Sequence, residues 1–235
     1  MVSVSCRKKE TPPSSPVFFT NTTYDAGSFD ASGTPTNLGT RETISPELLA
    51  FANNTLPSYT DLRKTNPELL TTKAIADITL TQKSNIKITF VASVATGNYN
   101  TLGYYTYPTS NPPASAKDIS KITYIFPSAG GGSLLQAGDN VTVGPINAGM
   151  SVGFVLLANA WTPTTKTVNT KAVHFASNDV LNPEFDPALK KHAVLINYTP
   201  ENRILIGLED TDRTLPTCDH DFNDLVVYAT VTPAP

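Results

Sequence analysis

Charged side chains are scarce in this sequence: Asp, Glu, Lys and Arg make up 16% of the 235 residues, against about 25% in an average globular protein. The net charge is −3, and the longest basic run is Arg7-Lys8-Lys9. Because a nucleic-acid-binding surface needs clustered Lys and Arg, we expect no nucleic-acid partner. Apolar runs are also short, and none approaches the roughly 18 residues of a membrane-spanning helix.

Cysteine is scarcer still, with only Cys6 and Cys218, which excludes a disulfide-rich scaffold and a CxxC redox pair. Small residues precede Cys6 and a charged, Pro- and Ser-rich stretch follows it, which resembles the lipidated cysteine of bacterial surface lipoproteins, including those of the Bacteroidota. We therefore predict lipidation at Cys6 and an outer-membrane lipoprotein that contacts the membrane only through this anchor. The alternatives are an incidental Cys6 in a tail and a Cys6–Cys218 disulfide, since residues 1–5 are too short for a secretion signal.

Recognisable catalytic motifs are missing as well. The histidines are His174, His192 and His220, and none lies in a GxSxG, HExxH or P-loop pattern. A glycosidase needs only two suitably spaced carboxylates, but acidic residues gathered in one loop are more typical of a metal site. We therefore expect a non-enzymatic protein.

Alternation of apolar and polar residues predicts β-strands along most of the chain. Residues 86–91 alternate with a period of two, the pattern of a half-buried strand. Similar short runs lie at residues 74–80, 119–126, 140–143, 151–159, 171–175, 192–198, 203–208 and 225–231. Since no helix of about 10 to 15 residues separates them, a parallel α/β fold is excluded. We predict an all-β fold, an antiparallel β-sandwich or jelly roll with one or two short helices.

The helices and the domain boundary are predicted from local signals. Ser45 before Pro46 predicts the start of a short helix, and residues 66–70 could start a second helical turn. We predict that residues 1–43 form a lipoprotein-like N-terminus and a Thr-, Ser- and Pro-rich tether with one early edge strand. We predict that residues 44–235 form a single β-sandwich domain.

Oxygen-bearing side chains are concentrated near the C-terminus: Glu209, Asp210, Asp212, Asp219, Asp221, Asn223 and Asp224. The spacing Asp219-x-Asp221-x-Asn223 resembles the first half of a calcium-binding loop, because short Asp and Asn side chains bring hard oxygens close to a turning backbone. The loop is not an EF-hand, since Asp224 and Thr230 stand where Gly and Glu are expected. We predict Ca²⁺ as the cofactor.

Three alternatives to calcium stay open. One is a solvated acidic turn, and another is a hydrogen-bonded cap in which Asp and Asn close Asx-turns onto backbone N–H groups and Arg213 pairs a carboxylate. The third is a zinc site using Cys218 and His220, whose spacing does not match a structural zinc motif.

Several segments together resemble a known family: 98–107, 125–127, 153–161, 182–184, 208–210 and 219–226. Over roughly residues 99–232 the chain resembles the bacterial extracellular domain of unknown function 4114. The resemblance implies an exported, surface-located, non-enzymatic calcium-associated β-sandwich. Carried over residue by residue, it implies metal ligands, or direct supports of them, at Glu209, Asp210, Asp219, Asp221, Asn223 and Asp224.

Other residues around these segments carry secondary predictions. Phe222 is expected to fill the core. A second polar group, which either completes the site from another loop or forms a turn before Pro183, consists of Asn178, Asp179, Asn182 and Glu184.

The aromatic residues Tyr104, Tyr105 and Trp161 could form a platform on which sugar rings stack. Tyr104 and Tyr105 would point to opposite faces of a strand, so at least one is expected in the core. The leading hypothesis is a surface-anchored calcium-dependent binding module, glycan-binding or adhesive. The alternative is a structural surface protein that assembles with itself or another surface protein, with calcium stabilising the fold. An exposed aromatic row would favour the first, and an open apolar edge strand the second.

Overall fold

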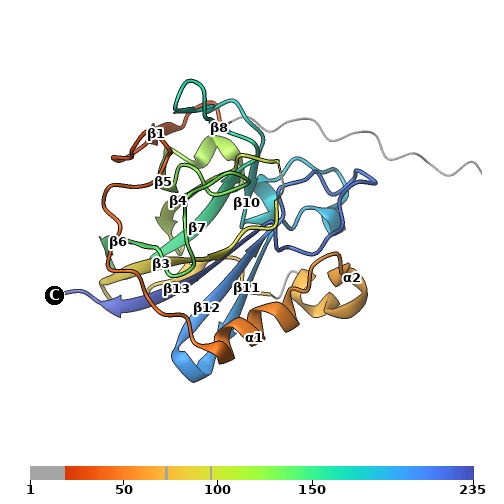
Figure 1. Cartoon of the computed structure of the whole chain (residues 1–235), viewed down its shortest axis with the longest axis horizontal. Coiled ribbons are helices and arrows are strands. Elements are labelled where there is room, and N and C mark those ends of the chain that lie inside the picture. Colours follow the sequence, from red (N-terminus) through yellow and green to blue (C-terminus); the bar gives the residue numbers. More distant parts are fainter. Residues whose placement is uncertain (1–18, 72–73, 96) are drawn as a thin grey trace, which may run out of the picture.

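The computed structural model describes residues 19–71, 74–95 and 97–235, and its strands form two packed sheets (Figure 1). The first sheet has the order β1-β5-β4-β7-β10, and β2 also pairs with β7. The second has the order β11-β12-β13-β3-β6. All of these pairings are antiparallel except β1 with β5. The predicted all-β sandwich is confirmed.

The elements have the following bounds. The first sheet contains β1 (Thr23–Asp25), β2 (Ile78–Thr79), β4 (Thr101–Pro108), β5 (Lys121–Phe126), β7 (Met150–Leu157) and β10 (His174–Ala176). The second contains β3 (Ser84–Ala92), β6 (Asn140–Ile146), β11 (Ala193–Tyr198), β12 (Arg203–Leu208) and β13 (Leu225–Pro233). A small hairpin is formed by β8 (Trp161–Thr162) and β9 (Thr167–Val168).

Helical structure is limited to short segments. The α-helices are α1 (Pro46–Thr55) and α2 (Leu62–Thr65), and the 3-10 turns are η1 (Pro67–Leu70), η2 (Ala116–Asp118), η3 (Asp179–Leu181), η4 (Pro187–Leu189) and η5 (Thr199–Glu201). The helix predicted at Ser45 is confirmed, because the Ser45 hydroxyl accepts a hydrogen bond from the Leu48 amide at 3.1 Å. Among the described helices, none has the length and apolarity needed to cross a membrane.

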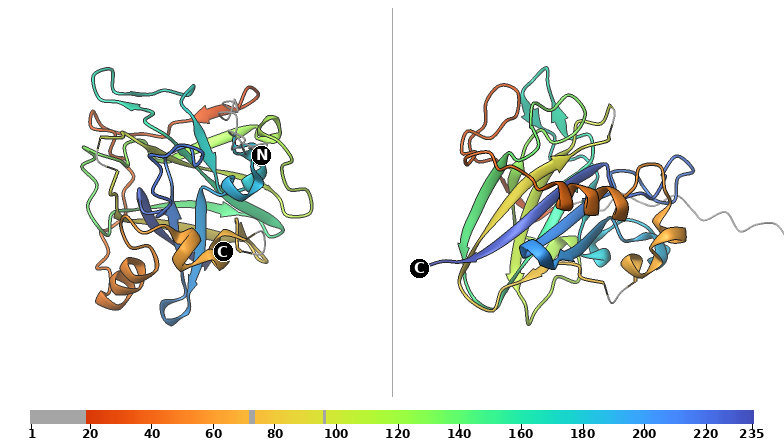
Figure 2. Two further views of the ribbon diagram at one scale, coloured as in Figure 1. Left: turned by 90° about the vertical axis from the view of Figure 1, so that its right-hand side faces the viewer. Right: turned by 60° about the horizontal axis from the view of Figure 1, so that its bottom comes forward.

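Apolar side chains fill three layers rather than one. The layer between the sheets includes Ile88, Phe126 and Val227. On the outer face of the second sheet, α1 packs with residues of β11, β12 and β13 (Figure 2). The outer face of the first sheet is covered by the segment around Phe19 and by residues next to η2 and η3, such as Ile119. Both sheets therefore have apolar packing on both faces, and β12 and β13 are covered from either side where they approach the acidic segment.

The described part of the predicted tether, residues 19–43, belongs to the sandwich. β1 pairs with β5, Leu38 packs against the core between the sheets, and Glu42 accepts hydrogen bonds from Thr89 and Tyr228. The boundary predicted between residues 43 and 44 is therefore wrong, because apolar and charged residues before it find partners in the sheets. Cys6 lies outside the described residues.

Candidate metal centre

The acidic segment is the connection between two neighbouring strands. The last residue pair between β12 and β13 is Leu208 with Leu225. Glu209 comes directly after β12 and Asp224 directly before β13, so both lie at the end of this strand pair. Residues 209–224 form a loop, blue in Figure 1, at the end of the sandwich opposite the C-terminal residue. A Cβ on Gly207 would lie 2.5 Å from both a Leu56 methyl and the Phe222 carbonyl oxygen. Glycine at position 207 thus allows the loop and the end of α1 to pack tightly on β12.

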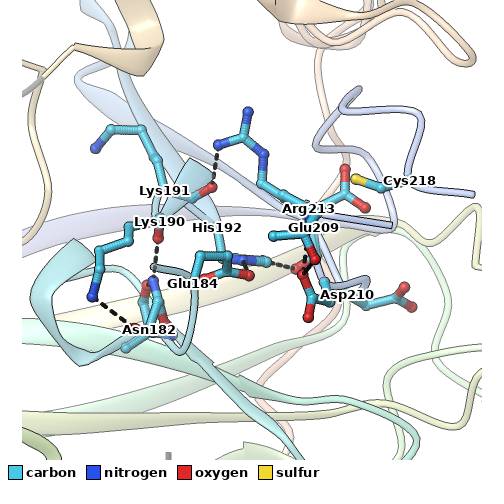
Figure 3. Close-up of polar contacts among 12 residues, drawn as sticks. Asn182, Glu184, Lys190, Lys191, His192, Glu209, Asp210, Arg213 and Cys218 are labelled. Atoms are coloured by element: carbon cyan, nitrogen blue, oxygen red, sulfur yellow. Dashed lines mark hydrogen bonds and ion pairs between the residues drawn. The ribbon is translucent and has the colours of Figure 1, made fainter. Parts of the chain in front are cut away.

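Five carboxylates meet in this loop as two groups of three that share Glu209. One group is Glu209, Asp219 and Asp221, and the other is Glu209, Asp210 and Asp224; within each, one oxygen per residue lies within 4.8 Å of the others. Glu209, Asp210 and Asp221 are only 1%, 5% and 2% exposed. The structure therefore brings together all five predicted carboxylate ligands (Figure 3 shows Glu209 and Asp210).

The second group is oriented by residues far away in the sequence. Asp210 Oδ2 accepts hydrogen bonds from the side-chain amides of Asn100 at 2.6 Å and Asn98 at 3.0 Å. Asp224 Oδ2 accepts the Asp210 backbone N–H at 2.8 Å. Sequence reasoning gave Asn98 and Asn100 no role at the site, because an asparagine before a strand carries no sign of a partner more than a hundred residues away.

The first group is anchored to the chain between α1 and α2. Asp221 Oδ2 accepts the Tyr59 backbone N–H at 2.7 Å, and Oδ1 accepts the Asn223 N–H at 3.0 Å. The Asn223 amide nitrogen donates to the Leu56 carbonyl and to the Ser58 hydroxyl, both at 3.2 Å. The amide nitrogen of Asn223 is thus used to brace the loop.

Phe222 and Arg213 support the loop from the protein interior. Phe222 is fully buried in the apolar layer under α1, as predicted. The Arg213 guanidinium lies 5.0 Å from the centre of the Phe222 ring and donates a hydrogen bond to His220 Nδ1 at 3.1 Å. It also donates to the Lys191 carbonyl oxygen at 2.9 Å (Figure 3). These acceptors are neutral, so these hydrogen bonds of Arg213 do not make the carboxylate pair of the capping alternative.

Burial gives these carboxylates unusual proton affinity. It raises the pKa of Glu209 to about 7, and the neighbouring charges of Asp219 and Asp221 add to the effect. Burial, together with Glu209 and Asp210, raises the pKa of Asp224 to about 10. Burial also raises the pKa of Asp221. Glu209 Oε2 is buried and has no hydrogen-bond partner. A cation among these oxygens would supply the missing positive charge.

The ligand set consists of hard oxygens, which suit Ca²⁺, Mg²⁺ or Mn²⁺ better than zinc. Cys218 is a free, buried thiol whose pKa is raised by burial, and its Sγ lies 3.3 Å from His220 Nδ1. That nitrogen also faces the Arg213 N–H. Neither residue joins the two groups of potential ligands in the described part of the chain, so the zinc alternative gains no support.

The second predicted polar group, Asn178, Asp179, Asn182 and Glu184, does not complete the acidic site. Its first three members form the turn before Pro183 that was the alternative prediction. Asn178 accepts the Val180 N–H, Asp179 pairs with Lys191 at 3.2 Å, and Asn182 bonds the backbone of Ala176.

Glu184, the last member of that group, has a different role. Its Oε1 lies 2.7 Å from His192 Nε2, and His192 Nδ1 lies 3.1 Å from the Glu209 carbonyl oxygen (Figure 3). Both side chains are fully buried. This pair fixes the backbone of Glu209 rather than adding a ligand.

The predicted aromatic platform is not formed. Tyr105 and Trp161 are only 1% and 4% exposed, because they pack in the outer layer of the first sheet and beside Phe29, respectively. They are therefore unable to offer a ring face to a ligand in this conformation. Tyr104 is half-buried and lines a pocket of about 400 Å³ with Lys121 and other residues, which include none of the acidic loop.

Comparison with known proteins supports the family resemblance over the C-terminal part of the chain. Residues 146–232 match the family described as "Domain of unknown function (DUF4114)". This segment contains Trp161 and all six predicted metal-site residues, whereas Tyr104 and Tyr105 lie outside it. No curated protein and no solved structure matches the chain.

Proposed function

We propose that this protein is a non-enzymatic binding module of the bacterial cell surface that uses calcium to hold its C-terminal loop. The observation that carries the proposal is Glu209, a buried carboxylate with an unpartnered oxygen, shared by two groups of acidic side chains. Surface location is supported by the sequence around Cys6, which would be lipidated and anchor the protein to the outer membrane.

Calcium is the proposed ion because the two groups of carboxylates offer only oxygen ligands from an irregular turn. Ca²⁺ accepts six to eight oxygens in flexible geometry, whereas Mg²⁺ demands a near-ideal octahedron. His220 and Phe222 have left-handed backbone angles, with φ of 61° and 59°. These angles fold the loop so that Asp219 and Asp221 come together beside Glu209.

A binding role is supported by Tyr59, which lies beside the acidic loop. Tyr59 is 81% exposed, its φ is 58°, and its N–H is held by Asp221. An exposed ring fixed in a rarely adopted backbone conformation suits a contact with a sugar face or a partner protein. The ring would then depend on calcium for its position. A glycan array in calcium buffer, with Tyr59→Ala as the matched variant, tests the sugar-binding form of this role.

The structural alternative is supported by a different feature. Val180, Phe185 and Leu215 are 53%, 59% and 46% exposed, although they are large apolar side chains. Large apolar side chains that gather in one exposed patch favour contact with another copy or another surface protein. Sedimentation with and without calcium distinguishes the two: self-association that Phe185→Ser abolishes would put assembly ahead of sugar binding.

Thermal unfolding of the full chain tests the calcium site itself. We expect a large upward shift of Tm when excess chelator is replaced by millimolar Ca²⁺, and smaller shifts with Mg²⁺ or Zn²⁺. Binding to the folded state alone stabilises by about 2.7 kcal/mol per site at a hundred times Kd. Asp221→Ala should lose a large part of the shift, and Glu68→Gln, an exposed control, should keep it. An unchanged Tm with every metal would overturn the calcium proposal.

A further inference from the structure

The acidic loop offers ligands for more than one ion. Oxygens that surround a single calcium at 2.3 to 2.6 Å lie no more than about 5 Å apart. Each group of three carboxylates meets this limit, whereas the five residues form two groups rather than one. Only Glu209 belongs to both groups, and its Oε2 is buried without a hydrogen-bond partner.

The charge of the loop points the same way. Five ionised carboxylates bring five negative charges to a largely buried region, and one divalent cation would leave three of them unbalanced. Arg213 is a buried cation in the same loop, 2% exposed, and it interacts electrostatically with Glu209. Two divalent cations together with the Arg213 guanidinium balance the five carboxylates.

We propose that the loop binds two calcium ions bridged by Glu209. The first is held by Glu209, Asp219 and Asp221, and the second by Glu209, Asp210 and Asp224. The inference rests on the calcium site proposed above and adds the number of ions and the ligands of each.

The two ions stabilise different parts of the molecule. The first fixes Asp221, which holds the Tyr59 N–H and so the connection between α1 and α2. The second joins Asp210 to Asp224 where β12 and β13 separate, next to Asn98 and Asn100. The first ion therefore holds the backbone of Tyr59, whose side chain is exposed, and the second closes the end of the β12–β13 pair.

Counting bound calcium tests the proposal on the full chain. Equilibrium dialysis and native mass spectrometry of the chelator-treated, calcium-reloaded protein should give two ions for the wild type and for the control Glu68→Gln. Asp219→Asn and Asp224→Asn should each give one. A single ion in the wild type would overturn the two-ion inference while leaving the calcium proposal intact, and no bound calcium would overturn both. The wild-type count decides the matter even if a variant does not fold.

Hydrogen exchange of the Tyr59 amide separates the two sites. In saturating calcium, Asp219→Asn should speed this exchange at least tenfold, and Asp224→Asn should leave it near the wild-type rate. Equal acceleration by both variants, or by neither, would contradict two ions with separate roles.

Discussion

Two acidic side chains that lie beside the second sheet, Glu42 and Glu209, have opposite environments. Glu42 accepts hydrogen bonds from Lys87, Thr89 and Tyr228, and lies 3.4 Å from Arg203. Burial alone would raise its pKa, but these partners lower it to about 2. Glu209 has an unpartnered oxygen and acidic neighbours, and its pKa is raised to about 7.

The difference separates a structural carboxylate from a candidate ligand. The charge of Glu42 is neutralised by the protein's own cations and hydroxyls, so it contributes to the fold without any added ion. The charge of Glu209 is not, so the folded protein either keeps a proton on the loop or binds a cation there. Four experiments can break or sharpen this contrast.

The largest effect is expected for Glu209→Gln, which removes the shared ligand. In calcium at about a hundred times Kd, the variant should lose at least about 2.7 kcal/mol of unfolding free energy relative to the wild type. In chelator it should be as stable as the wild type or more stable, because one repelling charge is gone. Urea unfolding in both buffers checks this reversal, and a deficit of equal size in both would mean that Glu209 is purely structural.

The pH dependence of the chelated protein should come next in size. Since the folded state raises the pKa of Glu209 from 4.5 to about 7, it binds more protons than the unfolded state in this range. The contribution of Glu209 to stability in chelator should therefore fall as the pH rises from about 4.5 to 7. The difference in unfolding free energy between wild type and Glu209→Gln isolates this contribution from His174 and His220, whose pKa values are lowered to about 4 by burial and which act in the opposite sense. Glu42 acts in the opposite sense: its contribution is present above its ordinary pKa of 4.5 and is lost as the pH falls toward 2.

Calcium should remove the first of these trends, because metal binding keeps the carboxylates ionised. Unfolding curves at a series of pH values, with and without calcium, measure both. A stability difference between wild type and Glu209→Gln that stays constant between pH 5 and 7 in chelator would show that Glu209 has ordinary proton affinity.

Glu42→Gln should give a smaller effect that does not depend on metal. Loss of the charged acceptor weakens hydrogen bonds from Lys87 and Tyr228, and should cost about 1 to 2 kcal/mol after allowance for solvent at a side chain that is partly exposed. The same loss is expected in calcium and in chelator. A calcium response that disappears in this variant would break the contrast with Glu209.

The smallest effect is expected for Asn98→Ala, which removes one donor to Asp210. Residues that orient a metal ligand typically contribute at least tenfold to affinity, and because Asn100 still holds Asp210, we expect calcium affinity to fall about tenfold. Stability in chelator should change little. Asn147→Ala, at an exposed position, is the control, and calorimetric titration measures both.

The acidic cluster could be predicted from the sequence because most of its candidate ligands are close together along the chain. The Asp219-x-Asp221 spacing and the adjacent Glu209 and Asp210 are visible without a structure. The supporting residues were not predictable: Tyr59, Asn98 and Asn100 reach the loop only through the pairing of strands and the packing of α1 on the second sheet.

The fold class was predictable, whereas the burial of particular aromatics was not. β3 shows the alternation of a strand with one apolar face, but β7 is buried continuously from Ser151 to Leu157 because both faces are covered. The same outer layers bury Tyr105. The apolar–polar periodicity of a strand predicts which residues can face a core. It does not predict that residues distant in the sequence, such as Phe19, bury the other face of the same strand.

Calorimetric titration of calcium into the chelator-treated full chain tests the central claim most directly, with wild type, Glu42→Gln and Glu209→Gln compared at pH 6. We predict that wild type and Glu42→Gln bind calcium and release protons, seen as a binding heat that depends on the buffer, and that Glu209→Gln shows little or no binding. Wild-type-like binding by Glu209→Gln would contradict the assignment of the acidic loop as the metal centre.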